Sequence, residues 1–553
     1  MPHMQNPMIV QSDRSVLLEA DHPQYEDARD VLARFAELEK SPEHIHTYRI
    51  SPLSLWNAAA SGLDAETILD MLNRLSKYEV PQNISREITE FITRYGQIRL
   101  IKRDDKLILE TDDPVLMAEV SGLPSVNKFM IGKIDGRSVF VGDRFRGHIK
   151  QALIKVGFPV EDMAGYVTGT PLAFQFRGST RDGLPFSMRD YQSDSVRAFH
   201  MNGALRGGNG VIVLPCGAGK TVVAIGAMAA LQCQTLILSA NTVALRQWRD
   251  ELLDKTTLTS DDIGEYSGEV KEIKPVTLAT YQILTYRKSK TDEFKHFDLF
   301  NREGWGLIIY DEVHLLPAPV FRFTSEIQAR RRLGLTATLI REDGRESDVF
   351  SLIGPKRYDM PWKLLERQGW IAEAYCQEIR VDLPEERRMP YAVANRREKF
   401  RIASENDHKA DMIRLLLAQH PTDQILIIGQ YLKQIKEVAA IFNLPLITGS
   451  TPLQTRIELY AKFRSGEIKR LVVSKVANFA VDLPDANVAI QISGTFGSRQ
   501  EEAQRLGRIL RPKIDGSSAI FYSIVTRNTL DQDYAVNRQL FLTEQGYQYT
   551  IHD

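Results

Sequence analysis

From about residue 185 to the end of the chain, short apolar runs rich in Val, Ile and Leu alternate with longer stretches of helical periodicity. Unbroken β-branched runs separated by helices are typical of parallel strands that are buried on both faces. One series covers residues 211–215, 235–240, 276–280, 307–312 and 333–338. A second series covers residues 425–429, 445–449, 470–474, 488–493 and 519–525. Two such series predict two doubly wound α/β domains in tandem, with a junction near residues 362–371.

The N-terminal third has a different pattern. Residues 8–21 alternate between apolar and polar side chains, which indicates strand pairing, whereas residues 24–39 and 64–77 have the apolar spacing of helices. Short strand candidates follow between about residues 96 and 142. We therefore expect two small α/β modules ahead of the two parallel-sheet domains. The four predicted domains are residues 1–98, 99–175, 176–367 and 368–553.

The composition excludes several classes of protein. Of 553 residues, 43% are hydrophobic and 25% are charged, as in ordinary soluble domains. Lys plus Arg number 70 and Asp plus Glu number 71, so a nucleic-acid-binding surface would need basic residues clustered locally. Cys216, Cys233 and Cys376 lack the spacing for a disulfide framework, a four-cysteine zinc site or a four-cysteine iron–sulfur cluster. Because we find no signal pattern and no apolar run of about 18 residues, we expect a cytoplasmic protein without membrane association.

The sequence LPCGAGKT follows the first predicted strand of the first series and precedes an apolar helical stretch, which is the context of a phosphate-binding loop. Gly217 and Gly219 allow backbone amides to wrap phosphates, Lys220 can neutralise the β/γ oxygens and Thr221 can hold Mg²⁺. Leu214 stands where the general pattern has Gly. The candidate nucleotide-binding residues here are Leu214, Pro215, Cys216, Gly217, Ala218, Gly219, Lys220 and Thr221.

Two further motifs follow strands of the same series. Asp311 and Glu312 end the run LIIYDE, where Asp311 would hold the Mg²⁺ shell and Glu312 would activate the attacking water; the alternative is a strand-end turn with solvated acids. Two residues later, His314 could link the nucleotide state to the next motif. That motif is Thr336-Ala337-Thr338, whose hydroxyls could bridge the acids to an interdomain cleft, although the tripeptide alone is a weak signal.

In the second series, QRLGRILR places Gln504, Arg508 and Arg511 near one face of a helix. Arginines on a second domain that face a phosphate site suit an arginine-finger role, and Gln504 would help to bind the nucleotide. The alternative interpretation is a solvated basic helix.

The chain resembles superfamily 2 helicases in the order of its motifs, which are LPCGAGKT, DEVH, TAT and QRLGRILR. The motors of these helicases contain two RecA-like domains. In GLTATLIREDG, the residues Arg341, Glu342 and Asp343 resemble the RED motif of the XPB (xeroderma pigmentosum group B) family. Residues 474–493 and 492–513 resemble the end of that family's motor, and residues 18–63 resemble its N-terminal domain. The length is similar to that of prokaryotic members.

The resemblance implies DNA-dependent ATP hydrolysis with Mg²⁺, 3′-to-5′ helicase polarity and a role in DNA repair or promoter-type opening. It also implies a damage-recognition-like domain at residues 99–175 and a short thumb-like element at residues 383–407. The run KVANFA at residues 475–480 departs from the Gly-Asp-Thr-Ser pattern of the family, but Asp482 keeps a matching position for coupling.

Other candidates lie upstream of the phosphate loop or after predicted strands. Arg189 and Gln192 precede the loop, and Gln suits adenine's hydrogen-bonding edge, with a helix cap as the alternative role of Gln192. Loops that follow parallel strands share one edge, which makes their polar residues candidates for DNA-backbone contacts, with solvated loop residues as the alternative. These are Thr242, Arg246, Gln282, Thr448, Gly449, Arg456, Ser474 and Lys475. The basic run Arg330-Arg331-Arg332 is interpreted as a solvated strand entry.

Three functions remain in competition: a DNA helicase or translocase, an RNA helicase, and a catalytically silent nucleic-acid-binding scaffold. The joint presence of Lys220, Asp311 and Arg511 opposes the silent scaffold. We expect a monomer in the nucleoid that acts on single-stranded and forked or duplex DNA, with a repair nuclease as a possible partner class.

Overall fold

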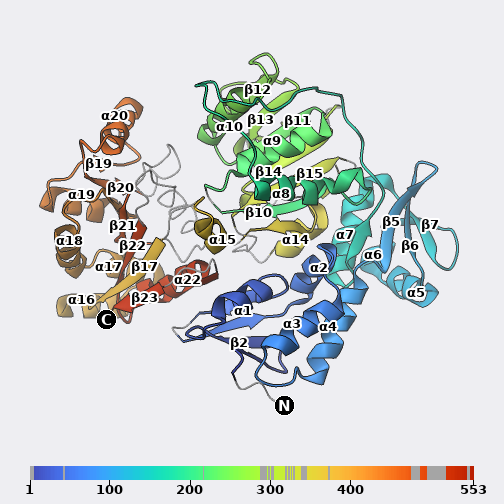
Figure 1. The fold of residues 1–553 in the computed structure, drawn as a ribbon, viewed down its shortest axis with the longest axis horizontal. Coiled ribbons are helices and arrows are strands. Elements are labelled where there is room, and N and C mark those ends of the chain that lie inside the picture. Colours follow the sequence, from blue (N-terminus) through green and yellow to red (C-terminus); the bar gives the residue numbers. More distant parts are fainter. Residues whose placement is uncertain are drawn as a thin grey trace. The chain divides into compact units, whose positions relative to one another are not determined.

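The computed structural model describes residues 5–41, 44–215, 217–286, 296, 299, 304–317, 320–321, 324–325, 327, 330–337, 345–360, 362–370, 374–474, 486–494, 519–544 and 549–552 (Figure 1). The chain divides into two compact units. The first comprises Met1–Glu37, Tyr48–Leu214 and Gly219–Met360, and the second comprises Leu38–Thr47, Pro215–Ala218 and Pro361–Asp553. Each unit is described by itself below.

The first module contains a four-stranded sheet in the order β1-β2-β4-β3. Its strands are β1 (Met8–Val10), β2 (Ser15–Glu19), β3 (Glu37–Lys40) and β4 (Ile45–Arg49), and its helices are α1 (Tyr25–Leu32), α2 (Pro52–Ala60), α3 (Ala65–Leu75) and α4 (Gln82–Arg94). Strands β1 and β2 pair antiparallel, which confirms the strand pairing predicted for residues 8–21. The helix predicted over residues 24–39 is wrong in its second half, because α1 ends at Leu32 and residues 37–40 form β3.

The second module is a five-stranded sheet in the order β7-β8-β6-β5-β9. Its strands are β5 (Ile98–Arg103), β6 (Lys106–Thr111), β7 (Met130–Lys133), β8 (Ser138–Val141) and β9 (Val160–Asp162), and its helices are α5 (Pro114–Gly122), α6 (Pro124–Asn127) and α7 (Arg146–Lys155). Alternate residues of the sheet, such as Leu100 and Leu109, pack with Ile149 and Leu153 of α7 in one core. A Cβ on Gly147 of α7 would lie 2.4 Å from the carbonyl oxygen of Ser325, so only glycine permits this close approach to the first motor domain.

The first motor domain is built on a seven-stranded parallel sheet in the order β12-β13-β11-β14-β15-β10-β16. Its strands are β10 (Asn209–Val213), β11 (Thr235–Ser239), β12 (Ile263–Tyr266), β13 (Val276–Thr280), β14 (Leu307–Asp311), β15 (Arg331–Thr336) and β16 (Lys356–Asp359). Its helices include α8 (Asp190–His200), α9 (Lys220–Leu231), α10 (Thr242–Lys255), α11 (Tyr281–Leu284) and α14 (Glu346–Leu352). The five predicted strands are confirmed within two residues, whereas the two edge strands β12 and β16 were not predicted.

The second motor domain has the corresponding order β19-β20-β18-β21-β22-β17-β23, again entirely parallel. Its strands are β17 (Ala374–Val381), β18 (Ile425–Gly429), β19 (Leu446–Ile447), β20 (Arg470–Ser474), β21 (Val488–Gln491), β22 (Ala519–Thr526) and β23 (Tyr549–His552). Its helices include α16 (Glu385–Val393), α17 (Arg396–Ser404), α18 (His408–Gln419), α19 (Leu432–Ile441), α20 (Leu453–Arg464) and α22 (Leu530–Glu544).

Both faces of the second sheet are buried. Ile425 and Ile427 of β18 belong to one hydrophobic core, whereas the alternate residues Leu426 and Ile428 belong to another. Side chains of a strand point alternately to opposite faces, so two cores lie on opposite sides of the sheet. The predicted fold class is confirmed: two tandem RecA-like, doubly wound parallel-sheet domains preceded by two small α/β modules.

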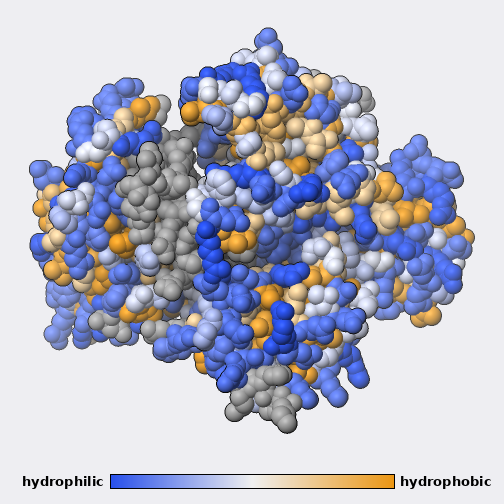
Figure 2. All heavy atoms as spheres, viewed as in Figure 1, coloured by the Kyte–Doolittle hydropathy of each residue, from blue (hydrophilic) through white to orange (hydrophobic). Residues whose placement is uncertain are grey.

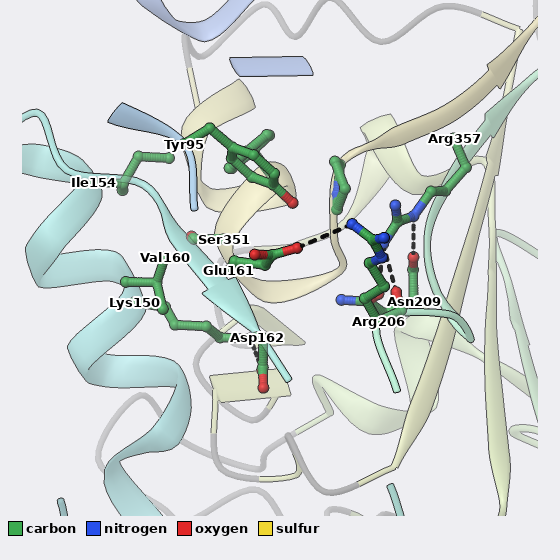
Figure 3. A pocket seen from close by; sticks show the side chains of 12 residues that line it. Tyr95, Lys150, Ile154, Val160, Glu161, Asp162, Arg206, Asn209, Ser351 and Arg357 are labelled. Carbon is green, nitrogen blue, oxygen red and sulfur yellow. Dashed lines mark hydrogen bonds and ion pairs between the residues drawn. The ribbon is translucent and has the colours of Figure 1, made fainter. Parts of the chain in front are cut away.

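Polar contacts join the two small modules to the first motor domain. Asn57 Oδ1 accepts a hydrogen bond from the backbone N–H of Lys356 (2.9 Å), and the Arg357 guanidinium donates to the carbonyl oxygen of Ala60 (3.3 Å). Both contacts involve β16, the edge strand of the sheet. Arg206, which lies beside Arg357, forms an ion pair with Glu161 of the second module at 3.5 Å (Figure 3).

The prediction that the run Arg330-Arg331-Arg332 is solvated is wrong for Arg332. Its side chain is fully buried, its Nε donates to the carbonyl oxygen of Leu352 (2.7 Å), and its guanidinium lies 5.5 Å from the centre of the Tyr166 ring. The second module supplies Tyr166 and therefore covers the start of β15. A basic run alone does not reveal that a neighbouring module will cover it.

The face shown in Figure 2 is largely hydrophilic, with apolar side chains in small groups. No helix within the described residues combines the length and the apolarity that a bilayer crossing requires.

Candidate functional site

The predicted phosphate loop joins strand β10 to the N-terminus of α9. The backbone N–H of Leu214 donates to the carbonyl oxygen of Thr336 (2.9 Å), and α9 begins at Lys220. Gly217 and Gly219 have φ values of +83° and +80°, which glycine adopts without steric cost. A helix N-terminus is a favourable place for an anion, because its backbone N–H groups and its dipole point towards that end. Cys216 lies outside the described residues.

Lys220 and Glu312 meet at the carboxyl edge of the sheet. Lys220 Nζ lies 3.1 Å from Glu312 Oε1, with 12% and 18% of the two side chains exposed. Glu312 has a φ of +51°, an uncommon value for a non-glycine residue, directly after β14. The structure thus brings together two predicted catalytic residues. The charges of Lys220 and Glu312 neutralise each other at the place where we expect the phosphates to bind.

Asp311 is held by residues that the sequence did not reveal. Its Oδ2 accepts hydrogen bonds from Ser239 Oγ and Trp248 Nε1, both at 3.0 Å, and its carbonyl oxygen accepts from the Tyr281 hydroxyl (2.8 Å). Burial, and secondarily the charge of Glu312, raises the pKa of Asp311. Ser239 could have been found, because it ends a predicted strand at the same edge. Trp248 lies within α10 and carries no sequence signal.

The substitution Trp248→Phe tests this support. It keeps an aromatic ring but removes the N–H that orients Asp311. Because this hydrogen bond is made to a charged group, its loss is expected to lower kcat for ATP hydrolysis by about tenfold. Trp305→Phe is the matched control, since Trp305 is buried in the same domain but donates to the carbonyl oxygen of Leu299. Steady-state ATPase rates and melting temperatures would be measured. Equal loss of turnover in both variants would contradict a specific role for Trp248.

His314 connects the acidic motif to the end of β15. Its Nδ1 lies 2.7 Å from Thr336 Oγ1 and 3.4 Å from Glu312 Oε2, and the ring is buried. A ring that contacts both motifs could transmit a shift of Glu312 to β15, and the coupling role of His314 stays a prediction. The other predicted coupling residues in this region, Thr338, Arg341, Glu342 and Asp343, lie outside the described residues.

Gln192 lies beside the phosphate loop. A Cβ on Gly219 would be 2.5 Å from Gln192 Nε2, which places the amide against the loop. Its Oε1 accepts a hydrogen bond from the backbone N–H of Arg189 (3.0 Å), so Gln192 does cap α8, and its adenine-binding role stays a prediction. The Arg189 guanidinium donates to the Tyr191 hydroxyl (3.0 Å). The two roles are compatible, because the cap fixes the side chain next to the loop.

The predicted DNA contacts of the first motor domain all follow strands at one edge of the sheet. Thr242 opens α10 directly after its N-cap Asn241, and Arg246 is exposed on the same helix. Gln282 is exposed on α11, which follows β13. These positions leave Arg246 and Gln282 accessible to a ligand.

In the second motor domain, Thr448 and Gly449 follow β19, and Ser474 ends β20. Arg456 behaves differently from the prediction of a direct contact. It is buried, and its guanidinium donates to the carbonyl oxygens of Thr448 (3.3 Å) and Thr451 (3.2 Å), so it shapes the loop. The remaining predicted residues of this domain lie outside the described residues: Lys475, Asp482, Gln504, Arg508 and Arg511.

Comparison with known proteins agrees with this geometry. The family model described as "ERCC3/RAD25/XPB C-terminal helicase" matches residues 365–553. "Helicase conserved C-terminal domain" matches residues 8–135, and "Type III restriction enzyme, res subunit" matches residues 185–341. The "DNA 3'-5' helicase XPB" of Kineococcus radiotolerans is 53% identical over 99% of this chain and 96% of that protein.

This chain belongs to the XPB family. A second relative, "DNA 3'-5' helicase XPB" of Mycobacterium tuberculosis, is 54% identical over 99% of this chain and 98% of that protein. The Saccharomyces cerevisiae "General transcription and DNA repair factor IIH helicase/translocase subunit XPB/SSL2" is 31% identical over 99% of this chain and 72% of that protein. The XPB resemblance seen in the motifs therefore extends over the full length, and the family identification is confirmed.

Proposed function

We propose that this XPB-family chain is an ATP-dependent DNA translocase and helicase that opens duplex DNA with 3′-to-5′ polarity, in DNA repair. The observation that supports it most directly is the juxtaposition of Lys220, Asp311 and Glu312 at the carboxyl edge of a parallel sheet. The relatives named above as DNA 3'-5' helicases match this chain along its full length. The proposed domain boundaries are 1–98, 99–175, 176–367 and 368–553.

ATP hydrolysis would begin with a change of partner for Lys220. The ammonium group pairs with Glu312 at 3.1 Å, and the triphosphate, with its higher negative charge, would draw it to the β/γ oxygens. Glu312 would then be available to orient a water molecule and accept its proton. Thr221 and the amides of the phosphate loop would hold the remaining phosphate oxygens.

The donor set fits a magnesium ion. Asp311 and Thr221 offer a carboxylate and a hydroxyl oxygen, the type of ligand that Mg²⁺ prefers. The raised pKa of Asp311 reflects burial next to the acidic Glu312, and a divalent cation would favour the ionised carboxylate. When bound, the ion would neutralise charge on the nucleotide phosphates.

Closure of the second motor domain would complete the site with Arg508, Arg511 and Gln504. Gly449, together with Arg246 and Gln282 of the first motor domain, would contact the DNA backbone, whereas Thr448 and Ser474 are buried. Arg341, Glu342 and Asp343 would serve strand opening. Single-stranded and forked DNA are the proposed partners, with a repair nuclease as a further partner class and the bacterial nucleoid as the location.

Unwinding of three duplexes tests the function. With ATP, the chain is expected to separate a 3′-tailed duplex and to leave 5′-tailed and blunt duplexes largely intact, because translocation must start on a single strand of the correct polarity. The Lys220→Ala variant, which lacks the phosphate-binding charge, is the control and is expected to separate none. Preference for the 5′ tail would reject the polarity. Stronger stimulation of ATP turnover by RNA than by DNA would favour the RNA-helicase alternative, and absence of turnover would favour the silent scaffold.

A further inference from the structure

Within the first compact unit, a small pocket lies where the two small modules meet the first motor domain (Figure 3). Its space, which includes the opening to solvent, is about 440 Å³. The first module lines it with Tyr95 at the end of α4, and the second module lines it with Lys150 of α7 and Glu161 of β9. The first motor domain lines it with Arg206, which precedes β10, and with Arg357 of β16. The pocket therefore lies at the amino end of β10, whereas the phosphate loop follows the carboxyl end of the same strand.

Lys150 shares its carboxylate partner with a second cation. Lys150 Nζ is 2.8 Å from Asp162 Oδ2, and the Arg146 guanidinium donates to both oxygens of the same carboxylate (2.7 and 3.1 Å). All three side chains are buried, and the buried guanidinium of Arg332 adds a further positive charge nearby. Burial chiefly, and secondarily the charges of Arg332 and Arg146, lower the pKa of Lys150 to about 7 against the opposing effect of Asp162. Positive charge therefore exceeds negative charge behind this wall of the pocket.

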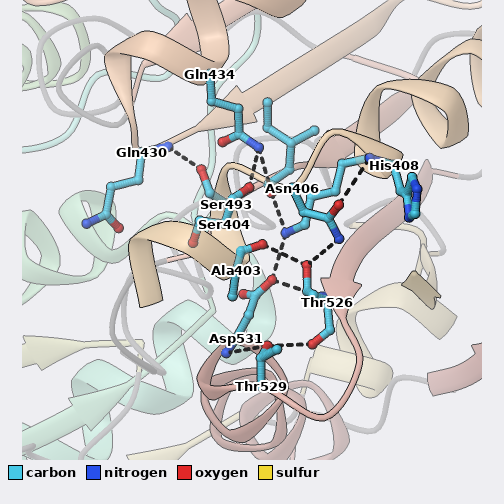
Figure 4. Close-up of polar contacts among 12 residues, drawn as sticks. Ala403, Ser404, Asn406, His408, Gln430, Gln434, Ser493, Thr526, Thr529 and Asp531 are labelled. Carbon is cyan, nitrogen blue, oxygen red and sulfur yellow. Dashed lines mark hydrogen bonds and ion pairs between the residues drawn. The ribbon is translucent and has the colours of Figure 1, made fainter. Parts of the chain in front are cut away.

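Another buried lysine of the chain shows a balanced arrangement for comparison. In the second motor domain, Lys409 Nζ is 2.7 Å from Asp531 Oδ2 and donates to the carbonyl oxygen of Ile492 (2.8 Å). Asp531 Oδ2 also accepts a hydrogen bond from the backbone N–H of Thr526 (3.1 Å), which is a neutral donor (Figure 4). A cation and a carboxylate in such a pair offset each other's charge, whereas two cations on one carboxylate leave a buried positive charge that a further anion would stabilise.

The two arginines of the pocket are paired loosely or with neutral groups. Arg206 lies 3.5 Å from Glu161, and 58% of its side chain is exposed. The Arg357 guanidinium donates to the carbonyl oxygens of Arg206 (2.6 Å) and Asn209 (3.0 Å), which carry no net charge, and burial lowers the pKa of Arg357. An anion in the pocket would thus face three cations, and Glu161 is the carboxylate with which it would compete for Arg206.

We propose that this pocket binds a small phosphate-bearing anion, which lies among Lys150, Arg206 and Arg357 and holds the two small modules on the first motor domain. A phosphate group offers several acceptor oxygens, and hydrogen bonds between charged groups are the strong ones. The anion is small and free, since Lys150 is buried and the backbone of a DNA strand would not reach it. The site is separate from the phosphate loop, so the proposal stands or falls independently of the proposed ATP hydrolysis.

Calorimetric titration with inorganic phosphate and with pyrophosphate tests the proposal. The parent for these titrations is the full chain with Lys220→Ala, which weakens binding of the same ions by the phosphate loop. We expect saturable binding to the parent. Arg206→Gln removes a cation from the pocket and is expected to weaken the affinity about tenfold, the loss of one charge-assisted hydrogen bond. Glu161→Gln removes the competing carboxylate and is expected to raise the affinity by about the same factor.

Arg197→Gln in the same parent is the matched control. Arg197 is an exposed arginine of α8 in the first motor domain, and it pairs with Asp194 outside the pocket. Its affinity for both ions is expected to equal that of the parent. Because an ion that binds only the folded chain stabilises it, phosphate is also expected to raise the melting temperature of the parent and of the control. Most of that rise should be lost in Arg206→Gln.

Three results would overturn the proposal. They are the absence of saturable binding, an affinity of Arg206→Gln equal to that of the control, and an affinity of Glu161→Gln that is unchanged or lower. A single-stranded oligonucleotide serves as a competitor. If it displaces phosphate from the parent but not from Arg206→Gln, the pocket binds the DNA backbone and the assignment to a small anion is rejected. Opposite shifts of affinity in Arg206→Gln and Glu161→Gln, without competition by the oligonucleotide, would support the site as proposed.

Discussion

Replacing Arg511 with alanine is expected to lower DNA-stimulated ATP turnover by about 10³-fold or more, because an arginine finger contributes about 10³–10⁵ in rate. The cation that the first motor domain offers in its described site is Lys220, which pairs with Glu312. Charge that develops on the γ-phosphoryl group therefore needs a second cation from elsewhere. ATP affinity should change little, since the first motor domain holds most of the nucleotide. Single-turnover hydrolysis and equilibrium nucleotide binding would separate the two effects.

Arg414→Ala is a suitable control for this variant, because Arg414 is an exposed arginine of the same unit on α18, outside the thumb-like element. It should retain stimulated turnover. The two-domain mechanism would be wrong if a fragment ending near residue 368 hydrolysed ATP as fast as the full chain does with DNA.

Glu312→Gln is expected to slow hydrolysis by about 10²–10⁴-fold, the contribution of a positioned general base. The amide has nearly the shape of the carboxylate but cannot accept the proton of the attacking water. It also releases Lys220 from its ion pair, so affinity for ATP should be equal to or higher than that of the unmodified chain. Lys220→Ala should instead weaken binding. Near-native turnover by Glu312→Gln would remove this residue from the water-activating role.

The strand positions were predictable because burial on both faces leaves a direct trace in the sequence. A strand such as β18 (ILIIG) must be apolar at every position, and its bounds were predicted without error. Edge strands lack this constraint. For that reason β16, whose sequence is KRYD, carried no such signal, although it completes the first motor sheet.

The candidate site was predictable as far as strand order and local motifs define it. Lys220 follows β10, whereas Asp311, Glu312 and His314 end or follow β14, and these two parallel strands flank β15. Their side chains therefore lie at the same carboxyl edge of the sheet. Trp248 could not be predicted, since its role depends on how the helix α10 is rotated towards Asp311.

Basic residues proved the most difficult to interpret from sequence. Arg332 and Arg456 both carry charges that suggest solvent or DNA, yet both are buried, with guanidinium groups that donate to backbone carbonyl oxygens. Whether such an arginine is buried depends on which backbone carbonyl groups the tertiary structure leaves without another hydrogen-bond donor. That information is absent from local sequence patterns.

The docking of the first module on β16 has a consequence for how the motor resists aggregation. The outer edge of a parallel sheet presents backbone N–H and C=O groups to which a strand of another molecule can add. Here Asn57 Oδ1 accepts a hydrogen bond from the backbone N–H of Lys356, so one backbone group of this edge is already paired within the chain. The first module therefore covers part of this edge of the sheet. A chain without the first module would expose this edge of the sheet to self-association, although its catalytic residues would all be present.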